Sequence, residues 1–383
     1  MKTEKSPLTF NRTILILCLA ILAFASQTSS KAVPPHRQFV SSNMTFSASS
    51  LTLAPSSSLS AGSSSAFVEG PVIVTADDLN IGPSSGYLVN ILNGNHSSIA
   101  GGAFGETDTD YDFIGAGFAN QVSDIMSGIL AGSGNYITAS NCFIGSGAGN
   151  FIDSSLGYAY DSAVGSGYHN YIATEYAFIG AGADNNVLGD GGFIGSGYFN
   201  TINGDYASVG GGSYNVASGT FSCIFGGTYA NANSYCQYAH ANTAFLNPAN
   251  SYAVYGSSQT SEFLLSRTTI SGTTTELFLD GDTASHRIVF PFNGTWTFQL
   301  LVTARSANGE SGGFQANGVI KNVNGNTTFV GGGTTMAVPA IASDVAGWTV
   351  SAAIVNNALS VSVTGNSATN RWVARIHTAE VIY

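Results

Sequence analysis

Residue types that could carry chemistry are few in this chain and scattered. Asp108, Asp110 and Asp112 alternate within one short segment, as the ligands at the start of a calcium loop do. An EF-hand loop places glycine directly after the third acid, and Phe113 occupies that position. The segment is therefore interpreted first as a solvated acidic turn, with a surface Ca²⁺ site as the alternative.

A second pattern suggests a nucleophile. Residues 309–313 (GESGG) fit G-x-S-x-G, the motif of serine hydrolases, which requires a strand-to-helix turn and His and acid partners. No helical pattern follows, so a glycine-rich hairpin loop is favoured. The six histidines show no ligand spacing, and no acids pair at a predictable distance for glycoside hydrolysis. The sequence thus predicts no catalytic residue, no cofactor and no enzymatic activity. A carbohydrate-active enzyme on a β-solenoid ranks third among the interpretations.

The N-terminus has the organisation of a secretory signal. Lys2, Lys5 and Arg12 precede an apolar run over 14–25, which ends on the small residues Ala23 and Ala25. The run is short for a membrane span, and no later segment could cross a bilayer. We expect residues 1–25 to be cleaved and the protein to be exported, to the medium or the cell surface.

Export makes disulfides possible. Three cysteines remain beyond residue 25, so at least one thiol is free or pairs between chains. Cys223 and Cys236 are 13 residues apart, close to one repeat of the pattern described below. Adjacent coils lie about 4.8 Å apart, so these two are predicted to form a bridge and Cys142 to stay free.

Composition excludes one class of partner. Charged residues make up 9% of the 383 residues, the net charge is −11, and no Lys or Arg occurs between Arg37 and Arg267. A groove that follows a phosphate backbone needs several cations. Nucleic acid is therefore not an expected ligand. The charge-poor composition also argues against a helical bundle.

The elements that must position these residues are set by an internal repeat. Nine aliphatic residues recur at intervals of 15, with one interval of 20; taken as position 0, they are Ile99, Ile114, Ile129, Ile144, Val164, Ile179, Ile194, Val209 and Ile224. Position 3 is glycine in all nine repeats: Gly102, Gly117, Gly132, Gly147, Gly167, Gly182, Gly197, Gly212 and Gly227. Position 6 is asparagine in seven: Asn120, Asn135, Asn150, Asn170, Asn185, Asn200 and Asn215.

A period of 15 residues fits one flat coil of two short strands and two tight turns. Positions 0, 2 and 8 are expected to point inward, and the extra residues within 154–160 to form a bulging loop. Glycine at position 3 permits positive φ or a close backbone approach. Asparagine at position 6 can form an Asx-turn or a ladder between coils. Stacked coils bury a continuous core that a single coil cannot.

The repeat resembles a known family. The segments at 193–202 (FIGSGYFNTI) and 206–219 (YASVGGGSYNVASG) resemble the head repeats of trimeric autotransporter adhesins, over about residues 84–240. That resemblance implies a left-handed parallel β-roll, with three chains side by side. Neither a heptad stalk nor a membrane-anchor barrel follows it here.

The C-terminal region has a different pattern. Apolar residues alternate over 296–304 and 348–354, separated by turns such as Asn308-Gly309, which predicts an antiparallel sandwich or jelly roll over 263–383. The segments 275–281, 296–305 and 371–375 resemble the C-terminal domain of certain phage tail-fibre and bacterial fibre proteins, which implies a trimeric fibre tip. The expected organisation is all-β: a signal peptide (1–25), a Ser-rich leader and cap (26–83), the roll (84–240), a connector (241–262) and the sandwich.

Aromatic residues are the remaining functional candidates. Several fall on the arm that follows the glycine, among them Phe118, Tyr168, Tyr198 and Tyr214. They could pack at the seam of a homotrimer, or form exposed strips that stack on sugar rings or contact a host protein. The predicted function is an exported homotrimeric surface fibre or adhesin-like protein, with the sandwich as tip. The alternative is a phage-derived tail-fibre receptor-binding protein, which the signal peptide disfavours.

Overall fold

The computed structural model describes residues 90–93, 95–155, 159–270, 272–281 and 286–383. Upstream of these it describes the backbone of five short strands: β1 (Gln38–Phe39), β2 (Leu51–Thr52), β3 (Ser58–Ala61), β4 (Val72–Ile73) and β5 (Asp78–Ile81). The predicted signal peptide and most of the leader lie outside the described residues. Within the described part every regular element is a strand, and no helix is long and apolar enough to cross a membrane.

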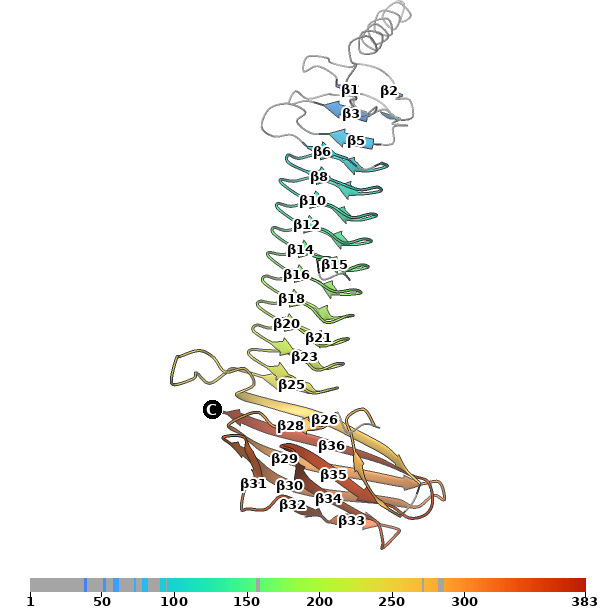
Figure 1. The fold of residues 1–383 in the computed structure, drawn as a ribbon, viewed down its shortest axis with the longest axis vertical. Coiled ribbons are helices and arrows are strands. Elements are labelled where there is room, and N and C mark those ends of the chain that lie inside the picture. The colour runs from blue at the N-terminus through green and yellow to red at the C-terminus, as the bar shows by residue number, and fades with distance from the viewer. Residues whose placement is uncertain are drawn as a thin grey trace, which may run out of the picture.

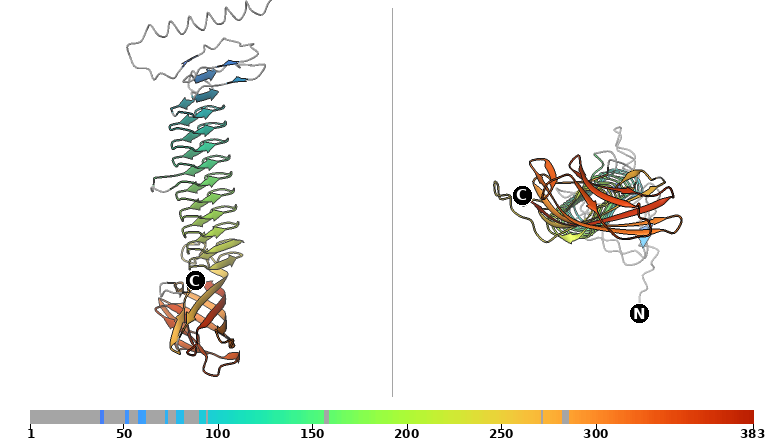
Figure 2. Two further views of the ribbon diagram at one scale, coloured as in Figure 1. Left: turned by 90° about the vertical axis from the view of Figure 1, so that its right-hand side faces the viewer. Right: turned by 90° about the horizontal axis from the view of Figure 1, so that it is seen from below.

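The described chain is an elongated column of stacked coils with a β-sandwich at its C-terminal end (Figures 1 and 2). Each of ten coils contributes one strand to each of two parallel stacks. The even-numbered stack contains β6 (Ile91–Leu92), β8 (Glu106–Thr107), β10 (Gln121–Val122), β12 (Tyr136–Ile137), β14 (Phe151–Ile152), β16 (Tyr171–Ile172), β18 (Asn186–Val187), β20 (Thr201–Ile202), β22 (Val216–Ala217) and β24 (Asn231–Ala232). The odd-numbered stack contains β7 (Ser98–Ile99), β9 (Phe113–Ile114), β11 (Gly128–Ile129), β13 (Phe143–Ile144), β15 (Ala163–Val164), β17 (Phe178–Ile179), β19 (Phe193–Ile194), β21 (Ser208–Val209), β23 (Cys223–Gly227) and β25 (Tyr238–Ala241).

The pairing register confirms the period. Ile129 lies opposite Ile144, 15 residues later, and the same offset joins most neighbouring coils. Across the insertion the offset is 20, because Ile144 lies opposite Val164 and Ile152 opposite Ile172. The extra residues therefore leave the stack between β14 and β15 without disturbing the ladder on either side.

The core of the column is narrow, and one of its inward-facing positions differs from the one that the sequence predicted. Positions 0 and 8 are buried along the column, as predicted. The prediction for position 2 is wrong, because Ala116 and Ser196 are exposed there. Apart from β23 and β25, each strand of the column has only two residues, so the chain turns after position 0 and the inward–outward alternation stops. The residue two places before position 0 faces inward instead, for example Asp112 and Ser127.

Glycine at position 3 is required by contact between coils. At Gly147, φ is +110°, and a Cβ atom would lie 2.0 Å from the carbonyl oxygen of Gly167 in the next coil. The other eight position-3 glycines also have positive φ. A Cβ atom added to any of them would lie 2.0–2.1 Å from a backbone oxygen of the following coil. The predicted role is confirmed.

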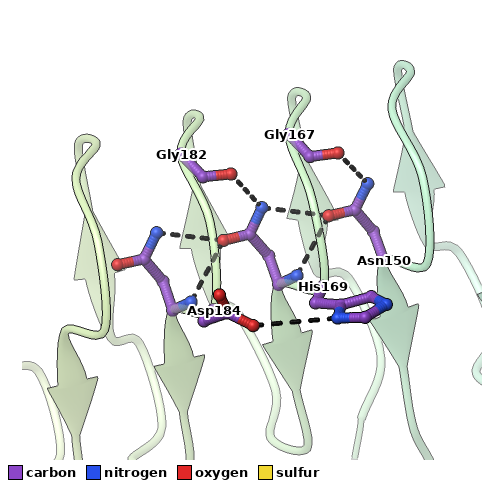
Figure 3. A network of polar contacts seen from close by, with 7 residues as sticks. Asn150, Gly167, His169, Gly182 and Asp184 are labelled. Atoms are coloured by element: carbon purple, nitrogen blue, oxygen red, sulfur yellow. Dashed lines mark hydrogen bonds and ion pairs between the residues drawn. The ribbon is translucent and has the colours of Figure 1, made fainter.

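The position-6 asparagines form a continuous buried ladder (Figure 3). The Asn170 side-chain amide donates to the Asn150 side-chain oxygen at 2.9 Å and to the Gly182 carbonyl at 2.9 Å. Its own side-chain oxygen accepts hydrogen bonds from the side chain and the backbone N–H of Asn185, at 2.9 and 3.2 Å. Of the two predicted arrangements, the ladder is the one present.

The last coil joins the sandwich through hydrogen bonds between strands. β25 pairs antiparallel with β26 (Ser258–Thr269), so the odd-numbered stack continues into the main sandwich sheet. That sheet also contains β36 (Asn370–Ile382), β29 (Gly294–Ser306), β30 (Ser311–Val323), β31 (Asn326–Phe329) and β33 (Ala340–Ser343). The second sheet contains β27 (Thr274–Leu277), β28 (Ile288–Val289), β35 (Ala358–Thr364), β34 (Thr349–Val355) and β32 (Thr335–Val338). Trp372, Phe298 and Phe314 lie buried between the two sheets.

Candidate functional site

The main candidate surface runs along the arm of each coil. We call the side chains four and five residues after position 0 the arm ridge. Phe118, Tyr168 and Tyr198 lie four residues after it and expose 50%, 51% and 43% of their surface. Small residues separate them along the same line of backbone bridges: Ser133, Ala148, Ala183 and Ser213. Along this line, exposed aromatic side chains are thus separated by small residues that leave gaps between them.

The adjacent position of the ridge holds stacked aromatic rings. Tyr214 lies parallel to Phe199, with ring centroids 5.2 Å apart, and to Tyr229 in the next coil, at 4.8 Å. Tyr255 contacts Tyr229 edge-on. Tyr214 is consequently half-buried by its neighbours, unlike Phe118, Tyr168 and Tyr198. The structure brings Tyr198 and Tyr214 together, with centroids 5.7 Å apart, whereas Phe118 lies several coils away.

These rings occupy an unfavourable backbone conformation. Phe199, Tyr214 and Tyr229 have φ of +53°, +54° and +61°. The left-handed region costs a non-glycine residue roughly 1–2 kcal/mol, and two other coils place glycine there, Gly134 and Gly149. Aromatic residues at this turn therefore carry a local backbone cost, which the stacking of their rings opposes.

Other aromatic residues of the column were not singled out by the sequence. Three residues before position 0 the chain turns again with positive φ, and Tyr206 stacks on Phe221 there at 5.2 Å. On the outer face of the odd-numbered stack, Phe178 lies parallel to Phe193 at 5.8 Å. Their recurrence at a fixed position of the repeat was the signal that could have identified them.

His169 and Asp184 lie beside the asparagine ladder, five residues after position 0 of adjacent coils (Figure 3). The His169 Nδ1 atom is 3.7 Å from Asp184 Oδ1. His169 is exposed, as expected for this turn. This contact joins two residues only, and among the described residues no group of three or more His, Cys, Asp or Glu side chains could hold a metal ion.

The three aspartates of the candidate calcium loop do not converge. Asp108 accepts hydrogen bonds from Asn93, Gln121 and Ser123 on the outside of the even-numbered stack. Asp110 accepts two from Asn95. Asp112 points into the core. The chain turns between β8 and β9, with positive φ at Tyr111, so the three side chains point in different directions and the structure does not assemble them into a Ca²⁺ site.

Asp112 is a buried carboxyl with few donors. Its side chain is 1% exposed, and Thr109 donates to one oxygen while the Ser127 backbone N–H donates to the other at 3.3 Å. Burial raises the pKa of Asp112 from 3.8 to about 6, and the hydrogen bonds lower it only in part. The core of the column therefore holds a carboxyl group, that of Asp112, whose pKa is about 6.

The cysteine pair is not bonded in the structure. Cys142, Cys223 and Cys236 are all free thiols. Cys223 lies opposite Tyr238, and Cys236 sits in the turn before it with φ of +51° and an exposed side chain. The predicted bridge fails because the turn directs Cys236 away from the strand that carries Cys223. Burial raises the pKa of the Cys142 thiol to about 11.

Ser311 of the G-x-S-x-G segment begins β30, in a hairpin with β29. Its backbone N–H donates to Asp344, and its hydroxyl accepts a hydrogen bond from Arg305. No helix follows Ser311 in the described chain. The hairpin interpretation is confirmed, and the nucleophile elbow is not formed.

A buried polar cluster joins the column to the sandwich. Gln259 accepts a hydrogen bond from the Asn231 backbone N–H at 2.9 Å and donates to the Asn231 carbonyl at 3.0 Å and to Glu380 at 2.8 Å. Thr378 also donates to Glu380. Burial raises the pKa of Glu380. A shallow cleft of about 380 Å³ lies beside this cluster, lined by His240, Thr260 and Thr297 among others.

The solved structures that are similar to this chain include two phage tailspike proteins. One is a tailspike protein, gp49, from Acinetobacter baumannii bacteriophage Fri1, described as a capsular polysaccharide depolymerase; identity is 10% over 87% of this chain and 69% of that one, with a TM-score of 0.20. The other is the tailspike of Acinetobacter phage vB_ApiP_P1, with 9% identity over 88% and 75% and a TM-score of 0.23. Similarity at this level carries no argument about function. No protein-family model and no curated protein matches the chain.

The prediction of no enzymatic activity does not stand, because the gp49 tailspike, one of the similar structures, is described as a depolymerase. That likeness assigns no activity to this chain. The sequence argument depended on acids paired by spacing along the chain. In a stack of coils, acids 15 residues apart become neighbours: the Asp190 backbone N–H donates to Asp205 Oδ1 at 3.2 Å. Spacing along the chain cannot exclude such pairs.

Proposed function

We propose that this chain is an exported, homotrimeric surface fibre that presents its C-terminal sandwich to a ligand on a host cell or another surface. The observation that carries the proposal is the uninterrupted sheet from the column into the sandwich. Ten coils stack in register, and β25 then pairs with β26 over four residue pairs. A rod of this kind holds its terminal domain at a fixed distance and orientation.

The arm ridge supports assembly of three chains. Monomeric proteins rarely leave extended apolar patches in water, yet Phe118, Tyr168 and Tyr198 project along one line of the column. Covering them would remove apolar surface from water at about 25 cal/mol per Å². Three columns side by side would seat these projections in the gaps at Ser133, Ala148 and Ser213.

Light scattering on the purified full chain tests assembly. We expect three times the chain mass and an elongated shape. A triple variant with Phe118, Tyr168 and Tyr198 replaced by Ser should scatter as a folded monomer, because other coils already carry Ser at this position. The matched control replaces Phe113, Phe143 and Phe178 on the odd-numbered stack by Ser. These side chains expose a similar fraction of their surface. It should remain a trimer.

A compact wild-type monomer that stays folded would contradict the fibre proposal, as would a triple variant that still forms trimers. Export is tested separately by fractionating cells that produce the chain. We expect the protein in the medium or on the cell surface, and its retention in the cytoplasm or in virions would favour the tail-fibre alternative.

A further inference from the structure

The outer face of the main sandwich sheet carries an unusual arrangement of cations. Arg305 of β29 and Arg371 of β36 lie directly opposite each other in the antiparallel register, and both side chains are exposed. Cβ atoms of such a pair lie about 4.5–5.5 Å apart, and like charges directly opposite are destabilising. This juxtaposition is unexpected in a chain with 11 basic residues and a net charge of −11.

The two guanidinium groups lack the partners that arginines elsewhere in the sandwich have. Arg287 pairs with Glu276 at 2.6 Å, and Arg375 with Glu262 at 2.6 Å. Within the described chain, Arg371 makes no hydrogen bond or ion pair, and Arg305 donates only to the Ser311 hydroxyl, at 3.2 Å. Neither guanidinium group forms an ion pair within the described chain; the Asp344 carboxylate accepts from the Ser311 backbone N–H beside Arg305 without pairing with it.

The neighbouring side chains suit a hydroxyl-rich polymer. In the same row of the sheet Thr268 flanks Arg371 and Ser311 flanks Arg305. The next rows along the face add Thr303, Gln315 and the exposed aliphatic residues Val373, Leu301 and Leu264. Hydroxyl and amide groups can bond sugar hydroxyls, and aliphatic side chains can cover the apolar faces of sugar rings.

We propose that this face binds an acidic polysaccharide whose carboxylate groups are held by Arg305 and Arg371. A guanidinium group matches a carboxylate in two parallel hydrogen bonds, and a carboxylate between the two arginines removes their repulsion. Nucleic acid fits less well, because Glu262 neutralises Arg375 and the outward-facing residues of β26, β29, β30 and β36 include no Phe, Tyr or Trp on which bases could stack. Tyr238 of β25 lies opposite Glu262, six residues along β26 from Thr268 in the row of the arginine pair.

The proposal depends on the proposed function only for its location, since the sandwich would be the displayed end of the fibre. Binding of polygalacturonate to the full chain, by calorimetry at low salt, is the direct test. Hydrogen bonds between ionised groups are stronger than neutral ones, and a tenfold change in affinity corresponds to about 1.4 kcal/mol. The double variant Arg305→Gln/Arg371→Gln should therefore bind at least about tenfold more weakly.

The matched control is Lys321→Gln. Lys321 is exposed on β30 in the same sheet, at the row of Thr295 and far from the arginine pair along the strands. Its replacement removes one positive charge, against two in the double variant, and we expect less than about a twofold loss. Neutral dextran should not bind the wild-type chain.

Four results would overturn the proposal: no binding of polygalacturonate, unchanged binding by the double variant, equal loss in Lys321→Gln, or equal binding of polyglutamate or single-stranded DNA, which would indicate a general polyanion surface. Melting temperature provides a further check. Arg371→Gln should melt at or above the wild-type temperature because a like-charge contact is removed, and a clear decrease would assign the pair a structural role. Light scattering on the same samples reports assembly independently, so either proposal can fail alone.

Discussion

At the residue scale, serine side chains two places before position 0 satisfy backbone groups of the turn in several coils. Ser127 shows the usual solution: its hydroxyl donates to the Ala139 carbonyl at 2.7 Å and accepts from the Cys142 backbone N–H at 3.0 Å. Ser97 makes equivalent contacts one coil before Asp112. Asp112 is thus the exception, with a longer side chain that brings an ionisable group into the core.

Stability should therefore depend on pH through Asp112. Its folded-state pKa of about 6 lies above the ordinary 3.8, so its stabilising contribution is fully present below pH 3.8 and is lost as pH rises through about 6. The difference between the two values corresponds to about 3 kcal/mol. Asp112→Ser should raise the melting temperature at pH 8 and much less at pH 4.

Thermal unfolding of both chains across this pH range is the measurement. Asp110→Ser, two residues earlier and outside the core, is the control and should leave the pH profile of the wild type unchanged. If Asp112→Ser were no more stable than the wild type at pH 8, the carboxyl would have to be well solvated or satisfied there.

At the scale of the coil, two sets of contacts hold neighbouring coils together. One is the close backbone approach at the position-3 glycines, and the other is the asparagine ladder. Gly147→Ala should destabilise the column, because the new Cβ would lie 2.0 Å from the Gly167 carbonyl oxygen at a φ of +110°. Overpacking costs about 1–3 kcal/mol, and the left-handed conformation adds roughly 1–2 kcal/mol.

Gly226→Ala is the matched control. Gly226 lies at position 2 of the last repeat, where other coils carry Ala or Ser, and an added Cβ would meet nothing within 4 Å. Denaturant unfolding should show a clear loss for Gly147→Ala and almost none for Gly226→Ala. Equal stability of the two variants would show that the coils do not approach as closely as described.

At the scale of the whole molecule, the column and the sandwich should unfold together because they share a sheet and a buried polar cluster. Gln259 is central to that cluster, since it bonds both backbone groups of Asn231 and the Glu380 carboxylate. Gln259→Ala should leave the Asn231 backbone N–H without this partner, at about 1–3 kcal/mol. It should also remove one donor each from the Asn231 carbonyl and Glu380, which keep Gln237 and Thr378.

Calorimetry of the full chain should show one transition for the wild type and two for Gln259→Ala, as the two parts lose their coupling. Thr260→Ala, at the next and exposed position of β26, should keep one transition. A single, unshifted transition in Gln259→Ala would mean that the β25–β26 pairing alone couples the parts.

The sequence by itself determined the period, the identity of the stacking residues and the change to an antiparallel fold. Those features repeat because each coil meets the next with the same atoms, so Gly147 and Asn170 carry their roles in their spacing. The alternation over 296–304 likewise predicted the inward face of β29, because a long strand keeps period two.

Only the tertiary structure decided which groups meet across coils and across sheets. Strands of two residues end their alternation at once, which is why position 2 faces outward and Asp112 inward. Asp190 and Asp205 become neighbours through stacking, and Cys236 lies in a turn, itself in the left-handed conformation, while Cys223 lies on a strand opposite Tyr238. Arg305 and Arg371 are 66 residues apart and are brought opposite each other by the register of β29 and β36. Local spacing carries no information about such contacts, because they depend on where distant strands end and pair.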